Sequence, residues 1–267
     1  MPSEPFTNRM LKDMREGRLS LGLGLHHLRT AAAPLLARAT DHDWLFIDAE
    51  HGAFGQDDLA QMCLASLMTG VTPVVRVCRT ALDQGVRALD NGAQGIVIPH
   101  VDTLADARLV AETFRYPPVG HRSWGGPPAL FGYQAGPLGE AQRAANREIL
   151  VVCMIESEAG VAAAGEIAAV GGVDALMVGT SDLSTEMGIP GQIGHQRVRD
   201  AVATVAEACE RAGKIMGVGV VPDHDLAAEY IARGARFIVA GTDHSYLASA
   251  ATARAALLRG AAPARNG

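Results

Sequence analysis

The segments LVVCMIESEAG (residues 150–160) and DALMVGTSDLS (residues 174–184) decide the fold of this chain. Each segment is a short apolar run with an acidic residue at or just beyond its end, Glu156 in the first and Asp182 in the second. About one helix of small residues separates the two runs, which is the pattern of a parallel β-α-β unit. The carboxyl ends of both strands meet at one edge of such a sheet, so we expect both carboxylates there.

The same alternation of strand and helix extends over the whole chain of 267 residues. We predict eight strands, each followed by a helix, at residues 19–25, 44–48, 73–78, 95–99, 150–155, 175–178, 214–220 and 236–240. Eight such repeats over about 250 residues predict an α/β fold, a (β/α)8 TIM barrel. A Rossmann-like open sheet is the alternative, but no G-x-G-x-x-G motif opens a helix after an early strand.

The composition agrees with one α/β domain over residues 1–267. Hydrophobic residues make up 48% of the chain and aromatic residues only 4%, so Ala, Val, Leu and Ile have to build the core, as in parallel sheets covered by helices. Cys63, Cys78, Cys153 and Cys209 lack a Cys-x-x-Cys spacing and are predicted to be reduced core residues. Residues 261–267 are predicted to be a flexible tail.

The charge of the chain limits its partners. The net charge is −6 and no cluster of Lys or Arg is present, which argues against nucleic acid and anionic membranes. No apolar run approaches the roughly 20 residues that span a bilayer, and Met1 to Asn8 lacks the hydrophobic core of a signal peptide. We therefore expect a cytoplasmic protein that binds a small molecule.

One long interruption breaks the regular alternation. Residues 115–147 exceed what a connection needs, and they contain Tyr116, Trp124, Phe131 and Tyr133, four of the chain's twelve aromatic residues. Long loops in compact domains are usually functional. We expect an active-site lid or a subunit contact here, and a surface excursion is the alternative.

Charged residues follow several of the predicted strands, where a barrel binds its substrate. Asp48, Glu50 and His51 end the second strand, and Arg76 ends the third. His51 is suited to moving a proton near neutral pH, and Asp48 could fix its tautomer. Arg76 suits an enolate or carboxylate oxygen. The alternatives are a structural histidine and a salt bridge from Arg76 to Asp48 or Glu50.

The two carboxylates of the opening segments predict a metal site. Glu156 and Asp182 lack a neighbouring His or Cys pair, and oxygen ligands of this kind select Mg²⁺ or Mn²⁺. In the alternative, each carboxylate caps its helix or pairs with an arginine. The N–H groups of Thr180, Ser181 and Asp182 would suit a substrate carboxylate beside the metal. Thr242-Asp243-His244 is predicted to cap a helix rather than to bind a ligand.

Several motifs resemble those of the HpcH/HpaI aldolases, which are metal-dependent class II pyruvate aldolases of the phosphoenolpyruvate/pyruvate barrel superfamily. The motifs run in order over most of the chain: DAEHG (48–52), LDNGAQG (89–95), RYPPVGHR (115–122), Ile155-Glu156 and GTSDLS (179–184). The resemblance implies a lyase that cleaves a 4-hydroxy-2-oxo acid to pyruvate and an aldehyde, or runs the reverse condensation. It also implies a homohexamer with a swapped C-terminal helix, expected at residues 245–258.

The resemblance also assigns roles to single residues. Glu156 and Asp182 are expected to hold Mg²⁺ or Mn²⁺, or Co²⁺, and Arg76 to hold the keto or enolate oxygen. His51 with Asp48 is expected to act as the base through water on the metal, with Glu50 as a supporting partner. A metal stabilises a pyruvate enolate electrostatically, so no Schiff-base lysine is needed. In the long loop, Arg122 and Trp124 are expected to contact the aldehyde end.

Two departures from the family pattern keep other activities open. Met154 stands where the family usually has glutamine, and Ser123 where RYPPVGHR is usually followed by glycine. Met154 faces inward below Glu156 and is expected to contact the substrate. A thioether cannot replace the hydrogen bonds of an amide, so the substrate and the type of reaction can differ from those of the family. One alternative is a related enzyme that decarboxylates oxaloacetate and then forms a carbon–carbon bond, as in macrophomate synthase. A non-catalytic metabolite-binding barrel is the other.

Overall fold

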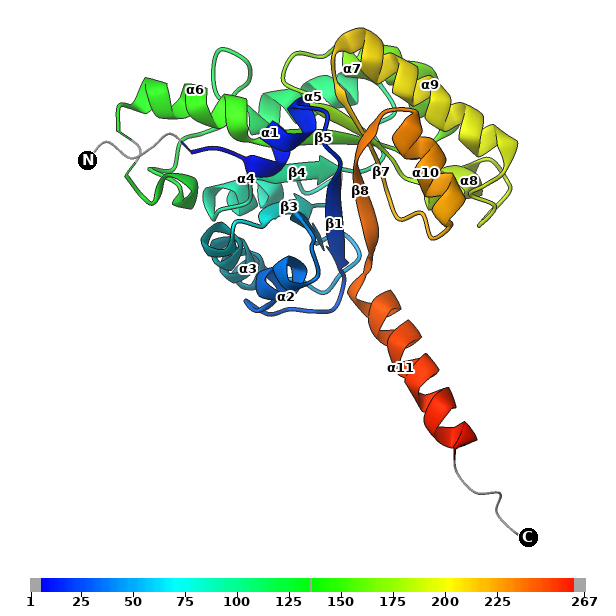
Figure 1. Cartoon of the computed structure of the whole chain (residues 1–267). Helices are drawn as coiled ribbons and strands as arrows, with labels where there is room; N and C mark the ends of the chain where they lie inside the picture. Colours follow the sequence, from blue (N-terminus) through cyan, green and yellow to red (C-terminus); the bar gives the residue numbers. More distant parts are fainter. Residues whose placement is uncertain (1–5, 135, 262–267) are drawn as a thin grey trace.

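The computed structural model describes residues 6–134 and 136–261, and these residues contain a closed barrel of eight parallel strands in sequence order (Figure 1). The strands are β1 (Ser20–Leu25), β2 (Trp44–Asp48), β3 (Thr72–Arg76), β4 (Gly95–Ile98), β5 (Leu150–Ile155), β6 (Ala175–Val178), β7 (Ile215–Val218) and β8 (Ala235–Thr242). The predicted TIM barrel is therefore confirmed. All eight strands lie within three residues of their predicted bounds.

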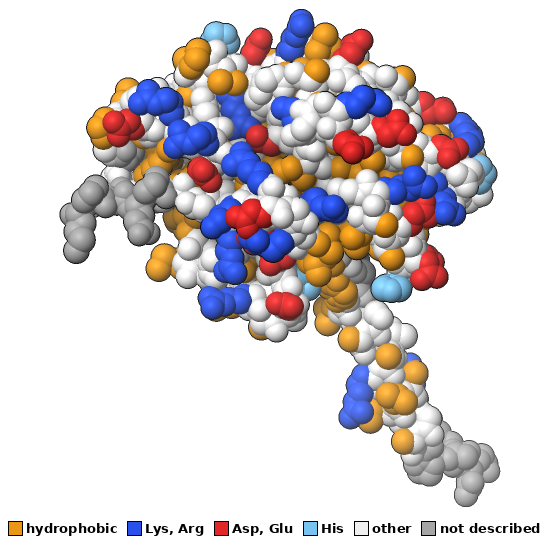
Figure 2. Space-filling view, turned by 45° about the horizontal axis from the view of Figure 1, so that its top comes forward, with side chains coloured by type: hydrophobic (Ala, Val, Ile, Leu, Met, Phe, Trp, Pro, Cys, Tyr) orange, Lys and Arg blue, Asp and Glu red, His pale blue; other side chains and the backbone are white. Residues whose placement is uncertain are grey.

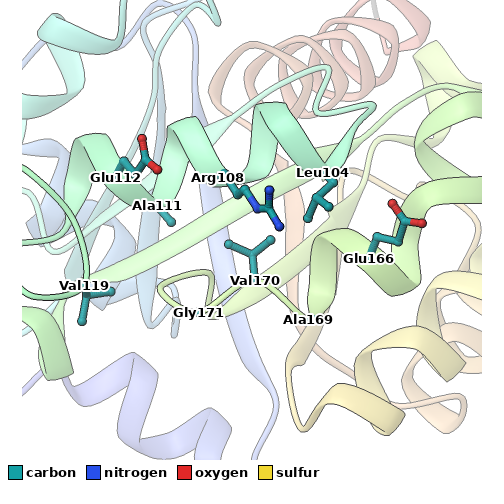
Figure 3. A pocket seen from close by; sticks show the side chains of 9 residues that line it. All are labelled: Leu104, Arg108, Ala111, Glu112, Val119, Glu166, Ala169, Val170 and Gly171. Atoms are coloured by element: carbon teal, nitrogen blue, oxygen red, sulfur yellow. The ribbon is translucent and has the colours of Figure 1, made fainter.

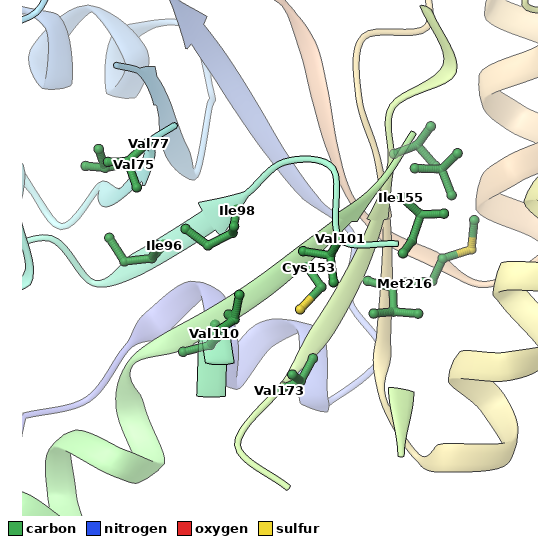
Figure 4. Packing of buried hydrophobic residues seen from close by; sticks show 14 of the residues in the cluster. Val75, Val77, Ile96, Ile98, Val101, Val110, Cys153, Ile155, Val173 and Met216 are labelled. Carbon is green, nitrogen blue, oxygen red and sulfur yellow. The ribbon is translucent and has the colours of Figure 1, made fainter. Parts of the chain in front are cut away.

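A helix follows each strand in turn, and all of these helices except the last pack around the barrel. They are α2 (Ala33–Ala39), α3 (Gln56–Thr69), α4 (Leu82–Asp90), α5 (Leu104–Phe114), α7 (Glu158–Ala168), α9 (Gln196–Ala212), α10 (His224–Ala232) and α11 (Asp243–Gly260). Apolar side chains fill the layer between strands and helices. Figure 4 shows part of this layer, where Ile98 of β4 and Cys153 and Ile155 of β5 pack with Val110 of α5.

Two further helices were not predicted, α1 (Arg9–Arg15) and α6 (Leu138–Glu148). Helix α8 (Thr180–Glu186) begins where the sequence analysis expected the free N–H groups of a helix start. Helix α6 lies at the end of the long interruption, so residues 115–147 are not one continuous loop. A short 3₁₀ turn, Ala129–Phe131, also lies within it. The lid or interface role of this segment stays a prediction, and the predicted tail lies outside the described residues apart from Ala261.

The cysteine prediction is confirmed for the core. All four thiols are unpaired, and Cys63, Cys153 and Cys209 are buried. Burial raises the pKa of each of these three thiols to about 12, so they are protonated and unreactive near neutral pH.

The barrel interior is solid at the end where the strands begin. Trp44, Phe46, Val74 and Phe237 point inward, as strand alternation predicts for the first three, and α1 adds apolar side chains from below. The bulky rings need small neighbours: a Cβ on Gly217 would stand 2.2 Å from the Phe237 ring. Side chains therefore pack the barrel interior at this end, whereas the carboxyl ends of the strands line a cavity.

Helix α11 projects away from the barrel (Figure 1), and none of its residues is buried. Leu247 and Leu257 are 72% and 69% exposed, and Figure 2 shows hydrophobic side chains along the projecting helix. The first residues of α11 contact the barrel through Asp243, His244 and Tyr246, whereas the leucines farther along the helix stay exposed. Such an exposed helix agrees with the expected swap, which stays a prediction. Elsewhere on the face shown in Figure 2, basic and acidic side chains are interspersed. Among the described helices, none combines the length and apolar character needed to cross a membrane.

Candidate active site

A cavity of about 200 Å³ opens at the carboxyl ends of the strands and contains most of the predicted site. Its lining includes the predicted residues His51, Arg76, Met154, Glu156, Thr180, Ser181 and Asp182, together with His26, Phe46, Met177, Gly179, Gly219, Val220, Val239 and Thr242. Residues from β2, β3, β5 and the start of α8 thus meet, as the barrel topology requires.

A second, larger cavity of about 520 Å³ lies on the outside of the barrel, between α5 and the end of α7 (Figure 3). Its charged side chains are Arg108, Glu112 and Glu166. None of the predicted site residues lines it, and it lies away from the strand ends. We therefore place the chemistry in the smaller cavity.

Asp48 holds Arg76 at the edge of the smaller cavity. Arg76 donates from Nε to Asp48 Oδ1 at 2.9 Å and from Nη2 to Oδ2 at 2.6 Å, and its Nε lies 3.3 Å from Glu50 Oε2. Burial opposes ionisation of Asp48, but hydrogen bonds from His26 and Arg76 outweigh it and hold the Asp48 pKa well below its usual range. The salt bridge that was the alternative for Arg76 is therefore present, and it orients the guanidinium in a cavity-lining position.

Glu156 is a nearly fully buried carboxylate, with 1% of its surface exposed. Burial raises the Glu156 pKa to about 7; His100 and Arg76 oppose this rise and the negative charge of Asp182 adds to it. Its Oε2 accepts a hydrogen bond from the backbone N–H of His100 at 3.1 Å. Glu156 does not cap α7, because the Ser157 side chain accepts the cap hydrogen bond.

The turn before α8 leaves room for the Glu156 carboxylate. A Cβ on Gly179 would stand 2.5 Å from Glu156 Oε1, so only glycine permits this close approach. Thr180 follows, and its buried Oγ1 has no hydrogen-bond partner within the described residues. An unpaired buried hydroxyl that lines a cavity is suited to a ligand.

Glu156 and Asp182 fit a divalent cation. Two carboxylates line one small cavity, and the charge of Asp182 disfavours ionisation of Glu156. A hard cation between them would relieve that repulsion and accept both oxygens. The alternative that Asp182 interacts with the helix terminus also has support, since Asp182 lies in the first turn of α8.

The structure differs from the sequence prediction in the histidine that Asp48 holds. The His51 imidazole is 65% exposed, its Nε2 lies 3.7 Å from Glu50 Oε2, and only the His51 backbone N–H reaches Asp48. The His26 Nε2 atom instead lies 2.8 Å from Asp48 Oδ2. His26 directly follows β1, so its place after an apolar strand was the signal that could have indicated it.

Neither of the two predicted loop residues, Arg122 and Trp124, lines the cavity of its own chain. Arg122 pairs with Asp90 at 2.6 Å, and its guanidinium carbon lies 4.8 Å from the centre of the Tyr116 ring. Trp124 also contacts Tyr116, with the centres of the two rings 5.5 Å apart. Their contact with a substrate stays a prediction and would require a neighbouring subunit.

Comparison with known proteins identifies the family. The profile of the HpcH/HpaI aldolase/citrate lyase family matches residues 30–250. The chain belongs to this family. It is 39% identical over 250 residues to the 4-hydroxy-4-methyl-2-oxoglutarate aldolase tasA of Hapsidospora irregularis, covering 91% of this chain and 92% of that protein.

Solved structures of this family have the same fold. The HpcH/HpaI aldolase of Desulfitobacterium hafniense DCB-2 is similar with a TM-score of 0.87 and 27% identity, over 96% of this chain and 98% of that one. Macrophomate synthase is similar with a TM-score of 0.79 and 26% identity, over 98% of this chain and 94% of that one.

The lysines of this HpcH/HpaI family member lie away from the cavity. The chain has two, Lys12 in α1 and Lys214 just before β7. The Lys214 ammonium donates to the backbone carbonyl of Val173. Both lie near the amino-terminal end of the barrel, and neither lines the cavity.

Proposed function

We propose that this protein is a divalent-metal-dependent aldolase that cleaves a 4-hydroxy-2-oxo acid to pyruvate and a carbonyl compound. The observation that carries the proposal is the meeting of Glu156, Asp182 and Arg76 in one cavity of an HpcH/HpaI barrel. The relative from Hapsidospora makes 4-hydroxy-4-methyl-2-oxoglutarate the first substrate to test. Cleavage of its C3–C4 bond gives two molecules of pyruvate.

Glu156 and Asp182 would hold the metal, with Mg²⁺ or Mn²⁺ preferred and Co²⁺ as a further candidate. When bound, the cation stabilises the negative charge that develops on the 2-oxo acid during cleavage. Arg76, fixed by its two hydrogen bonds to Asp48, binds the oxygen on which that charge collects. Thr180 Oγ1 and the first N–H groups of α8 bind the substrate carboxylate.

His51 is the base that we assign to the 4-hydroxyl proton. His26 is held by Asp48 on one side and lies 3.4 Å from His244 on the other, whereas His51 lines the cavity with its imidazole free to reorient. Glu50, rather than Asp48, is the carboxylate within reach of the His51 ring. The proton leaves the hydroxyl as the carbon–carbon bond breaks, and a proton from solvent completes pyruvate.

The test follows exchange of the pyruvate methyl protons in D₂O by NMR, with and without Mg²⁺ or Mn²⁺. We expect metal-dependent exchange in the wild type and none in Glu156→Ala or Asp182→Ala, which also lose divalent-ion binding. Arg76→Ala is expected to keep metal binding and to lose turnover. Metal affinity that is unchanged in Glu156→Ala would refute the ligand assignment, and absence of exchange would refute the enolate chemistry.

A second candidate function rests on Met154. The Met154 sulfur lies 3.8 Å from Arg76 Nη1, where the family usually presents an amide, and macrophomate synthase shares the fold. A metal-dependent oxaloacetate decarboxylase that then forms a carbon–carbon bond would use the same cavity. Parallel assays of aldol cleavage and oxaloacetate decarboxylation, with equal enzyme, distinguish the two by their kcat/KM ratio.

We also propose a cytoplasmic homohexamer in which α11 packs on a neighbouring subunit. The exposed Leu247 and Leu257 support such a contact, because they have no cover in their own chain. Light scattering coupled to gel filtration should give the mass of six chains. Leu247→Glu with Leu257→Glu should reduce that mass, and a monomeric wild type would exclude the assembly.

A further inference from the structure

We propose that His26, Asp243 and His244 form a second metal site, selective for Zn²⁺ and similar transition-metal ions, at the rim of the cavity. The site is separate from the Glu156–Asp182 pair and does not depend on the aldolase reaction. Within residues 6–134 and 136–261, it is the only group of three such side chains whose ligand atoms all lie within 4.8 Å of one another.

The barrel closure brings these residues together. His26 follows β1, and Asp243 and His244 follow β8, the last strand. The two strands are neighbours, with Gly24 paired to Thr242. More than 200 residues therefore separate His26 from the other two in sequence, although all three lie at one point of the barrel rim.

The spacing of the ligand atoms fits a tetrahedral ion. The His26 and His244 Nδ1 atoms are 3.4 Å apart, and His244 Nδ1 is 3.3 Å from Asp243 Oδ1. Tetrahedral coordination at about 2.0–2.1 Å separates two ligand atoms by roughly 3.3–3.4 Å. Both distances match this value, so an ion could enter along these two edges with little movement of the side chains.

Hydrogen bonds orient two of the three ligands. The ionised Asp48 lies 2.8 Å from His26 Nε2, which places the imidazole proton on Nε2 and turns the Nδ1 lone pair toward His244. The Asp243 carboxylate is anchored by backbone N–H groups, with Oδ2 accepting from His27 at 2.8 Å and from Leu28 at 2.6 Å. These arrangements are typical of the partners that hold metal ligands in place.

Three candidate ligand atoms thus lie within 4.8 Å of one another, and Asp243 Oδ1 also accepts from the backbone N–H groups of His244 at 2.8 Å and His26 at 3.2 Å. A proton on His244 Nδ1 can satisfy one neighbour at a time, either His26 Nδ1 or Asp243 Oδ1, whereas a cation would bind all three. Two imidazoles and a carboxylate suit Zn²⁺, Co²⁺, Ni²⁺ or Cu²⁺, unlike the all-oxygen pair at Glu156 and Asp182.

Access to the site is open on two sides. The His244 side chain is 51% exposed and the His26 side chain 25%, so an ion can enter from solvent. His26 also lines the catalytic cavity. With three protein ligands, the fourth coordination position is left to water or to an anionic group in the cavity.

Binding of Zn²⁺ to the full chain tests the proposal, and the Glu156→Ala background removes the competing carboxylate site. We expect Glu156→Ala to bind one Zn²⁺ per chain by isothermal titration. Adding His244→Ala should weaken this binding by at least about 100-fold. Loss of a residue that only supports a metal ligand costs about 10- to 100-fold in affinity, so a direct ligand should cost at least the upper value. His27→Ala is the matched control, since it removes an exposed histidine of the same rim and should leave Zn²⁺ affinity unchanged.

Co²⁺ provides a second readout, because its visible absorption spectrum reports tetrahedral coordination by nitrogen. The spectrum should appear in Glu156→Ala and disappear when His244→Ala or His26→Ala is added. If Glu156→Ala does not fold, Glu156→Gln replaces it. Absence of Zn²⁺ binding in this background, or equal losses from His244→Ala and His27→Ala, would overturn the proposal. Neither result bears on pyruvate exchange, so the proposed function is tested separately.

Discussion

The buried carboxylate of Glu156 should make the metal-free protein less stable as the pH rises. Its pKa is raised from the ordinary 4.5 to about 7, first by burial, with Asp182 adding to the rise and His100 and Arg76 opposing it. The folded state therefore binds more protons than the unfolded state between these two pH values, so stability falls across this window. At about 1.4 kcal/mol for each pH unit, the loss is roughly 3 kcal/mol.

Glu156→Gln removes this titration, and denaturant unfolding in the presence of a chelator measures the result. Between about pH 5 and pH 8, the wild type should lose roughly 3 kcal/mol relative to Glu156→Gln. Added Mg²⁺ at the higher pH should restore the wild type and leave the variant unchanged. Glu158→Gln, at an exposed position on α7, is the control and should follow the wild type. The same pH dependence in wild type and Glu156→Gln would show that titration of Glu156 does not cause the loss of stability.

Two further substitutions test the neighbours of Glu156 and Arg76. Gly179→Ala places a Cβ 2.5 Å from Glu156 Oε1 and should lower Mg²⁺ affinity by about tenfold or more in isothermal titration. Gly165→Ala on α7, where a Cβ meets no atom within 4 Å, is the control and should leave the affinity unchanged. Equal affinities of the two variants would contradict the close approach of Gly179 to Glu156. Met154→Gln gives Arg76 an amide acceptor in place of sulfur. It should raise the ratio of aldol cleavage to oxaloacetate decarboxylation about fivefold, since such a hydrogen bond contributes about 1 kcal/mol; an unchanged ratio would remove Met154 as a determinant of reaction type.

The barrel could be predicted because each strand carries its own signal. Short runs of Val, Ile and Leu separated by amphipathic helices recur eight times, and the same alternation put Phe46 and Met154 on the inner face. The missed helices lack that signal. Helix α6 buries only Ala141, Ala144 and Ala145, so its apolar stripe consists of small residues and gives a weak signal in an otherwise polar segment.

Residues that stand at strand ends could be assigned to the site from the sequence. The contacts between side chains of neighbouring strands could not. Arg76, Glu156 and Asp182 line the cavity as their positions indicate. Asp48 was assigned to His51 because the two are three residues apart, but β1 and β2 are neighbouring strands and bring His26 to Asp48 instead. The distance between His26 and Asp48 depends on strand register and on side-chain rotamers, which cannot be read from the spacing of residues in the sequence.

The packed barrel interior beneath the cavity limits the order in which products can leave. Trp44 and Phe237 close the barrel below, and Phe46 and Met154 form the floor of the cavity. Among the described residues, the cavity opens at the carboxyl ends of the strands, where substrate and products would enter and leave. In the aldol cleavage proposed above, the pyruvate fragment would bind at Arg76 and the cation held by Glu156, and the other fragment would lie nearer the opening. The fragment nearer the opening then departs first, which predicts ordered release in which the pyruvate formed from the enolate leaves last.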